Sequence, residues 1–171
     1  MQSPKLLGGL LAAVVLHFVG MRLFPSLAGL ADLFLVAVVL NALGGNSLSG
    51  LGFGFVAGLV HDSLTSGPFG LFGFADTLVG YLAARLAQRL VIQRATGVLG
   101  VVSFAAILES AIVVGLALLL LPSPELPSPI VVFARAGICG LIGFAIHLVT
   151  TRLRRGLDAR RRGRMSRLRM G

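Results

Sequence analysis

Long apolar runs, broken only by short turns, are the feature of this chain that most limits how it can fold. Hydrophobic residues make up 56% of the 171 residues, and charged residues only 12%. A soluble domain needs more polar surface than this composition supplies. A bilayer core of about 30 Å is crossed by about 20 apolar helical residues, and several runs are near that length. The sequence therefore predicts an all-α integral membrane protein.

Charged residues and turn signals divide the chain into six predicted membrane helices. The expected spans cover about residues 6–24, 33–45, 49–65, 69–88, 97–122 and 129–151. The second and third spans are short, so a count of five helices is the alternative. We interpret residues 1–151 as one helical membrane domain and residues 152–171 as an Arg-rich cytoplasmic tail.

The positions of the basic residues predict which side of the membrane each loop faces. Nine of the fifteen Lys and Arg residues lie in the last twenty positions. Cytoplasmic loops carry the excess of basic residues, so both termini are expected on the cytoplasmic side of the membrane. The tail is expected to contact anionic lipid headgroups, and nucleic acid is not expected as a partner because aromatic residues are missing from it. The basic residues singled out there are Arg154, Arg155, Arg160, Arg161 and Arg162.

Small residues recur every four positions on the third predicted helix. Gly50, Gly54 and Gly58 share one face of that helix, and Asp62 continues the same line. Such a face lets a second backbone approach closely. The glycines are either helix-packing positions or part of a partner interface. Asp62 either caps free backbone groups at the following turn or contributes to that interface.

The fourth predicted helix repeats this spacing after a short turn. Asp76 and Gly80 lie four residues apart on it, so the two small-residue faces each carry a carboxylate. The turn itself contains Gly67, Pro68 and Gly70. We therefore predict a tight hairpin whose two acidic residues point inward, because an ionised carboxylate is costly in lipid.

One further acidic residue lies in the middle of the fifth predicted helix. Glu109 needs a partner or a proton at that depth. Arg135, near the outer end of the sixth helix, is the candidate, because a long arginine side chain reaches inward. The two residues form either a structural pair that holds adjacent helices in register or part of a functional polar pocket.

No group of residues predicts catalysis, a metal site or a cofactor. His61, Asp62 and Ser63 are consecutive, and neighbouring helical residues point about 100° apart, so they cannot converge on one substrate atom. Cys139 is the only cysteine, which excludes an intramolecular disulfide. The chain is therefore not expected to be an enzyme.

The segment around the predicted hairpin resembles the bacterial rod shape-determining protein MreD family. The likeness rests on residues 54–71, GFVAGLVHDSLTSGPFGL, and on residues 78–82, LVGYL, together with the overall length and the layout of spans. His61 is a departure, since it has no place in the family pattern.

This resemblance implies a non-catalytic subunit of the cell-elongation machinery. Members of the family associate with the scaffold protein MreC and, through it, with RodA and a penicillin-binding transpeptidase that synthesise peptidoglycan. The resemblance also implies a fold similar to the substrate-binding subunits of energy-coupling-factor transporters. A vitamin-binding transporter subunit is therefore the alternative function, although the absence of Trp and the single Tyr disfavour a polar, aromatic-lined cavity.

Overall fold

The protein is all-helical wherever the structure describes it. The computed structural model describes residues 3–23, 30–65, 67–89, 95–124 and 126–168. Six helices occur in these ranges, which confirms the helical fold class and the count predicted from the apolar runs. They are α1 (Ser3–Leu23), α3 (Leu33–Gly44), α4 (Ser47–Leu64), α5 (Leu71–Arg89), α6 (Ala95–Leu120) and α7 (Pro129–Leu168).

Two of the helix starts are set by side-chain caps. The Asp32 carboxylate accepts the backbone N–H of Leu35 at 2.9 Å at the start of α3. The Asn46 side-chain oxygen accepts the N–H of Ser49 at 2.8 Å at the start of α4. Because the first N–H groups of a helix have no partner inside the helix, these two residues determine where the short α3 and the following α4 begin.

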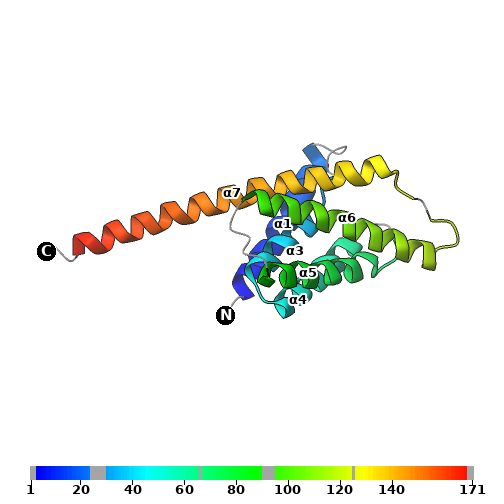
Figure 1. The fold of residues 1–171 in the computed structure, drawn as a ribbon, viewed down its shortest axis with the longest axis horizontal. Coiled ribbons are helices and arrows are strands. Elements are labelled where there is room, and N and C mark those ends of the chain that lie inside the picture. Colours follow the sequence, from blue (N-terminus) through cyan, green and yellow to red (C-terminus); the bar gives the residue numbers. More distant parts are fainter. Residues whose placement is uncertain (1–2, 24–29, 66, 90–94, 125, 169–171) are drawn as a thin grey trace.

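The hydrophobic core lies between α3, α5, α6 and α7. Helices α4 and α5 form an antiparallel hairpin with the most extensive contact in the molecule, and α6 packs along α7 in a second hairpin (Figure 1). The short helix α3 lies against both hairpins. Fully buried aliphatic residues from these elements include Leu35, Val39, Val79, Val98 and Val102. The two hairpins are therefore joined through the buried helix α3.

Within the part of the chain that the structure describes, two helices are long and apolar enough to cross a membrane by themselves. They are residues Ala95–Leu120 of α6 and residues Pro129–Leu153 of α7. Helix α3 is equally apolar but has only 12 residues, which is too short for a full crossing. Six membrane crossings and the orientation of the termini therefore stay predictions.

Helix α7 continues well past the end predicted for the last span. The apolar part ends at Leu153, and the helix runs on to Leu168. At 1.5 Å per residue, the additional 15 residues extend the helix by about 22 Å. Figure 1 shows this extension leaving the other helices as a straight rod. The Arg-rich tail is thus helical through Leu168 and continuous with the last apolar segment.

Candidate functional site

A cluster of buried charged side chains joins three parts of the chain that are distant in sequence. Nη2 of Arg135, on α7, lies 2.5 Å from Oδ2 of Asp32, just before α3. The same nitrogen donates to Glu109, on α6, at 3.0 Å from Oε1 and 2.9 Å from Oε2. Glu109 is fully buried and Asp32 is 7% exposed. One guanidinium therefore pairs with two carboxyl groups inside the bundle, and we call Asp32, Glu109 and Arg135 the charge cluster.

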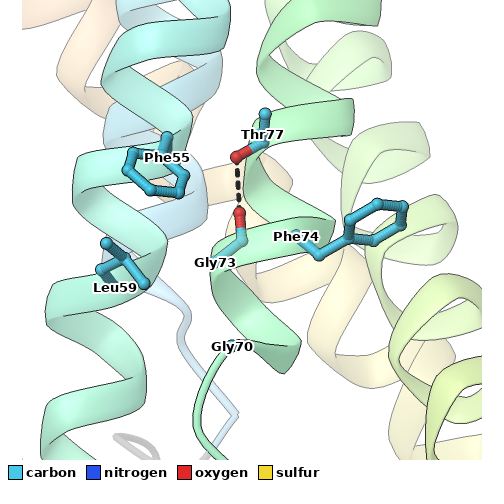
Figure 2. Close-up of a pocket in the computed structure, with 6 residues that line it drawn as sticks. All are labelled: Phe55, Leu59, Gly70, Gly73, Phe74 and Thr77. Atoms are coloured by element: carbon cyan, nitrogen blue, oxygen red, sulfur yellow. Dashed lines mark hydrogen bonds between the residues drawn. The ribbon is translucent and has the colours of Figure 1, made fainter.

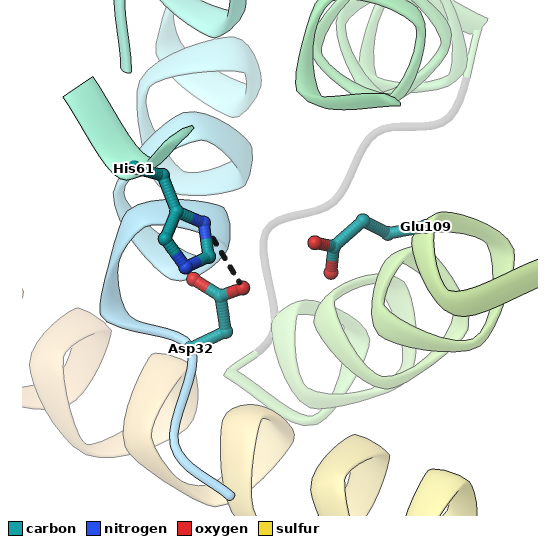
Figure 3. Close-up of side chains that lie close together, drawn as sticks. All are labelled: Asp32, His61 and Glu109. Carbon is teal, nitrogen blue, oxygen red and sulfur yellow. Dashed lines mark ion pairs between the residues drawn. The ribbon is translucent and has the colours of Figure 1, made fainter. Parts of the chain in front are cut away.

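His61 borders the charge cluster from α4. Its Nδ1 lies 3.7 Å from Oδ2 of Asp32, and Figure 3 marks this pair with a dashed line. This distance is too long for a hydrogen bond, and Nδ1 is buried with no partner among the described residues. The imidazole lies between two aromatic rings, with centroid distances of 5.0 Å to Phe34 and 4.1 Å to Phe72. The ring is therefore held in place by packing and not by its nitrogen atoms.

The donor atoms in this region also meet the spacing of a metal site. Ligand atoms of Asp32, His61 and Glu109 all lie within 4.8 Å of one another. However, the guanidinium of Arg135 contacts both carboxylates directly, so an arginine already supplies the positive charge that a metal ion would bring. We therefore interpret the cluster as an internal ion-pair network that fixes α3, α6 and α7 relative to one another.

Asp62 lies outside the charge cluster and has a different set of partners. Its Oδ2 accepts the N–H groups of Gly70 at 3.0 Å and Gly73 at 2.8 Å, and its Oδ1 accepts the N–H of Phe72 at 3.0 Å. These donors lie at the start of α5, where N–H groups have no intrahelical partner and the helix dipole favours an anion. The carboxylate at the end of α4 thus caps the first turn of α5.

The second acidic residue of the hairpin, Asp76, has no partner at all among the described residues. Its side chain is completely buried, and neither carboxyl oxygen forms a hydrogen bond there. Both Asp62 and Asp76 are buried, yet only Asp62 is satisfied by donors. The two carboxyl groups therefore differ in their hydrogen bonding, although each continues a line of small residues spaced four positions apart.

The glycine face of α4 is occupied by α5. A Cβ atom added at Gly50 would overlap the carbonyl oxygen of Gly80, and one at Gly54 would overlap that of Asp76. At Gly58 the added atom would lie 2.7 Å from the Cα of Gly73. All three glycines are buried in the hairpin, so they pack helix against helix and offer no exposed surface. A partner interface would have to use other residues of the two helices.

The turn residues between α4 and α5 are placed differently from the glycine face. Gly67 and Pro68 are exposed, and an added Cβ at Gly67 would meet no atom within 4 Å. Gly70 has a φ of +104°, a conformation that favours glycine. This backbone conformation presents the N–H of Gly70 to Asp62.

An apolar pocket opens on the outer side of the α4–α5 hairpin. It has a volume of about 240 Å³, and Figure 2 shows the residues that surround it. Phe55 and Phe74 are about half exposed, at 50% and 53%. The lining consists of Phe55, Leu59, Gly70, Gly73, Phe74 and Thr77. The Thr77 hydroxyl donates to the carbonyl of Gly73 at 2.5 Å, so the pocket presents mainly apolar atoms.

Two residues of the polar interior were not identified as site residues from the sequence. Asp32 directly precedes the second predicted span and was given no role, and His61 was considered only in the rejected group with Asp62 and Ser63 and as a departure from the family pattern. Asp32 and Arg135 are 103 positions apart, and no periodicity connects residues at that separation. Pairing the acidic residues of the apolar segments with the basic ones could have indicated Asp32, because Arg135 then has two candidate acidic partners, Asp32 and Glu109. The side chains of Arg154, Arg155, Arg160, Arg161 and Arg162 lie outside the described residues.

The fold and this interior define a helical protein that encloses several charged side chains in an otherwise apolar bundle. A family profile, described as rod shape-determining protein MreD, matches residues 5–155. The chain belongs to this family, which confirms the resemblance seen in the residues of the hairpin. Comparison with curated proteins and with solved structures gives no match.

Proposed function

We propose that this chain is a non-catalytic subunit of the bacterial cell-elongation complex in the inner membrane. In this role it binds the scaffold protein MreC and, through MreC, supports peptidoglycan synthesis by RodA and a penicillin-binding transpeptidase. The observation that carries the proposal is the family match over residues 5–155, which includes the helical bundle. A rod-shape-determining role follows from the family, and the partners and the mechanism are our proposal.

The arrangement of polar groups supports a binding role for this chain. The charge cluster is closed by its own arginine, and Asp62 is used by the backbone of α5. A hydrolytic site needs a nucleophile, a base and an oxyanion donor around one reacting atom. The charge cluster and Asp62 instead hold helices together, as expected for a subunit that acts through its surface.

We further propose that the apolar pocket on the outer side of α4 and α5 receives the membrane helix of MreC. The pocket lies within residues 54–77, and most of this segment carries the family pattern. Its half-exposed phenylalanine rings offer large apolar area beside two glycines, and close helix contact in lipid depends on such shape complementarity. The vitamin-binding alternative has less support, because a polar vitamin would find few hydrogen-bonding groups in this lining.

Co-purification with MreC tests both levels of the proposal. The full chain is expressed with tagged MreC, extracted in mild detergent and quantified in the eluate. Phe55→Ala and Phe74→Ala should each lower several-fold the amount of this chain that is recovered with tagged MreC. Phe104→Ala is the matched control, because Phe104 is 61% exposed on α6, away from the pocket, and it should leave recovery unchanged.

The outcomes separate the pocket from the function. If the wild-type chain does not co-purify with MreC at all, direct binding is contradicted. If the wild type binds and all three variants bind equally well, the function stands and the pocket is the wrong surface. Tight binding of a vitamin by the isolated chain would favour the transporter alternative.

We also propose that both termini are cytoplasmic and that the basic extension of α7 contacts anionic headgroups. The first turns of α1 and the far end of α7 lie toward the same side of the bundle in Figure 1, which agrees with this topology. Cysteine accessibility in intact cells tests it: a cysteine introduced at Ser166 should be protected from an impermeant reagent added outside, in a chain carrying Cys139→Ser.

A further inference from the structure

Asp76 is the one described carboxyl group that is buried without any partner. Its exposed fraction is zero, and both oxygens lack a hydrogen bond within the described residues. An ionised carboxylate without a partner in an apolar interior is strongly unfavourable, since each unmet charge loses its hydration. The neutral acid avoids most of this penalty. The burial of Asp76 therefore favours a bound proton on purely structural grounds.

The charges around Asp76 do not supply a substitute for that proton. Among the described residues, the other charged groups inside the bundle are Glu109 on α6, Asp32 before α3, Asp62 on α4 and Arg135 on α7. Three of these are acids, and the single arginine is already shared by Asp32 and Glu109. Asp62 is held at the start of α5 by three N–H groups. His61 on α4 faces Asp32. An ionised Asp76 would thus add a negative charge to a group of acids whose arginine is already engaged.

A metal ion is a poor replacement for the proton at this position. Hard cations require about six oxygen ligands, or several retained waters. Among the described residues, the only other buried side-chain oxygen without a hydrogen bond is Oγ of Ser49. Ser49 lies on α4 five residues before Gly54, the residue that contacts the backbone of Asp76, which is about 7.5 Å along the helix axis. The two groups are therefore too far apart to share one small ion.

We propose that Asp76 is a proton-binding site, and that the folded chain holds it as a neutral carboxylic acid at physiological pH. The proton is taken from water when α5 packs against α3, α4 and α6. Releasing it places a carboxylate within the helical bundle and opposes the packing of these helices. The assembled bundle is therefore stable only with the proton in place.

Infrared difference spectroscopy on the full-length chain in lipid nanodiscs tests the proposal directly. A neutral carboxylic acid has a carbonyl stretching band that is separate from the bands of a carboxylate. Asp76→Asn, which has nearly the shape of the neutral acid, should remove an acid band at neutral pH and leave the carboxylate bands unchanged. Asp62→Asn is the matched control, and it should remove carboxylate intensity instead.

A second measurement uses thermal unfolding at several pH values. Above about pH 4 an aspartate in the unfolded chain has lost its proton, so a native state that keeps the proton becomes less stable as the pH rises. As the pH is raised from about 5 to about 9, the midpoint temperature of unfolding of the wild type should fall, and that of Asp76→Asn should fall less.

Three results would overturn the proposal. They are a loss of carboxylate intensity in Asp76→Asn, parallel pH dependences for the two chains, and failure of Asp76→Asn to fold. The last result counts against it because an amide reproduces the neutral acid in size and charge.

Discussion

The close contact between α4 and α5 makes a sharp prediction about two glycines on the same helix. Gly54 faces α5, where an added Cβ would overlap the carbonyl oxygen of Asp76 and lie 2.8 Å from its carbonyl carbon. Gly52 is exposed and would meet no atom within 4 Å. Gly54→Ala and Gly52→Ala thus add the same methyl group to one helix, two residues apart. Any difference between them reports the contact with α5.

The magnitude follows from two opposing effects. Replacing glycine by alanine inside a helix stabilises it by about 1 kcal/mol through backbone entropy, and Gly52→Ala should show this gain. At Gly54 the obstacle is backbone that can yield only if the helices separate, so overpacking of about 3 kcal/mol should prevail. The net loss is then about 2 kcal/mol, and the two variants differ by about 3 kcal/mol, or by about 6–12 °C in Tm.

Thermal unfolding of both variants in the same detergent or nanodisc measures this difference. The wild type serves as the common reference, and helical content by circular dichroism checks that each variant folds before heating. Equal Tm values for Gly54→Ala and Gly52→Ala would contradict the packing argument. They would mean that α4 and α5 do not approach as closely as the glycine face requires.

Three further predictions follow from the other polar contacts and from the tail. Asp62→Ala leaves three N–H groups at the start of α5 without their acceptor and should lower the stability of the chain by about 2–4 kcal/mol. Ser63→Ala is the control, because Ser63 lies on the exposed side of α4, and it should change the stability by less than about 0.5 kcal/mol. Thermal unfolding of the two variants compares them. Arg135→Leu leaves two buried acids without their cation and should lower stability by about 3–5 kcal/mol. Glu109→Leu should lower it less, because Arg135 then still pairs with Asp32. Denaturation of both variants and of the double variant checks this order. Replacing Arg154, Arg155, Arg160, Arg161 and Arg162 by Gln should weaken association of the tail with anionic lipid by up to about 5 kcal/mol in total, which fluorescence quenching in nanodiscs with and without anionic lipid would detect.

The helices and the hairpin could be predicted because they depend on local patterns. Apolar runs of helical length, ended by turn residues, located five of the six described helices to within a few residues at both ends, and the start of α7 as well. The four-residue spacing of Gly50, Gly54 and Gly58 indicated the face that meets α5. The end of α7 was less predictable, because apolarity ends near Leu153 whereas arginine continues to favour a helix, and the structure is helical to Leu168.

The charge cluster was only half predictable. Glu109 and Arg135 were noticed because each is unusual inside an apolar helix. Asp32 had an ordinary explanation as a boundary residue, and it also serves as the cap of α3, so its second role had no local signal. Proximity across 103 positions depends on how α3, α6 and α7 pack, and side-chain periodicity within one helix carries no information about that packing.

The two acids of the hairpin show why equal spacing does not imply equal roles. Asp62 is the last acidic residue before the turn, so its carboxylate meets the free N–H groups at the start of α5. Asp76 lies in the interior of α5, where every nearby N–H is already used by the helix itself. A carboxylate at position 62 gains hydrogen-bond donors, whereas a carboxylate at position 76 loses its hydration without gaining any donor. Asp62 therefore fixes the end of α4 against the start of α5, whereas Asp76, four residues before Gly80 on the same buried face, lies where no described group donates to it.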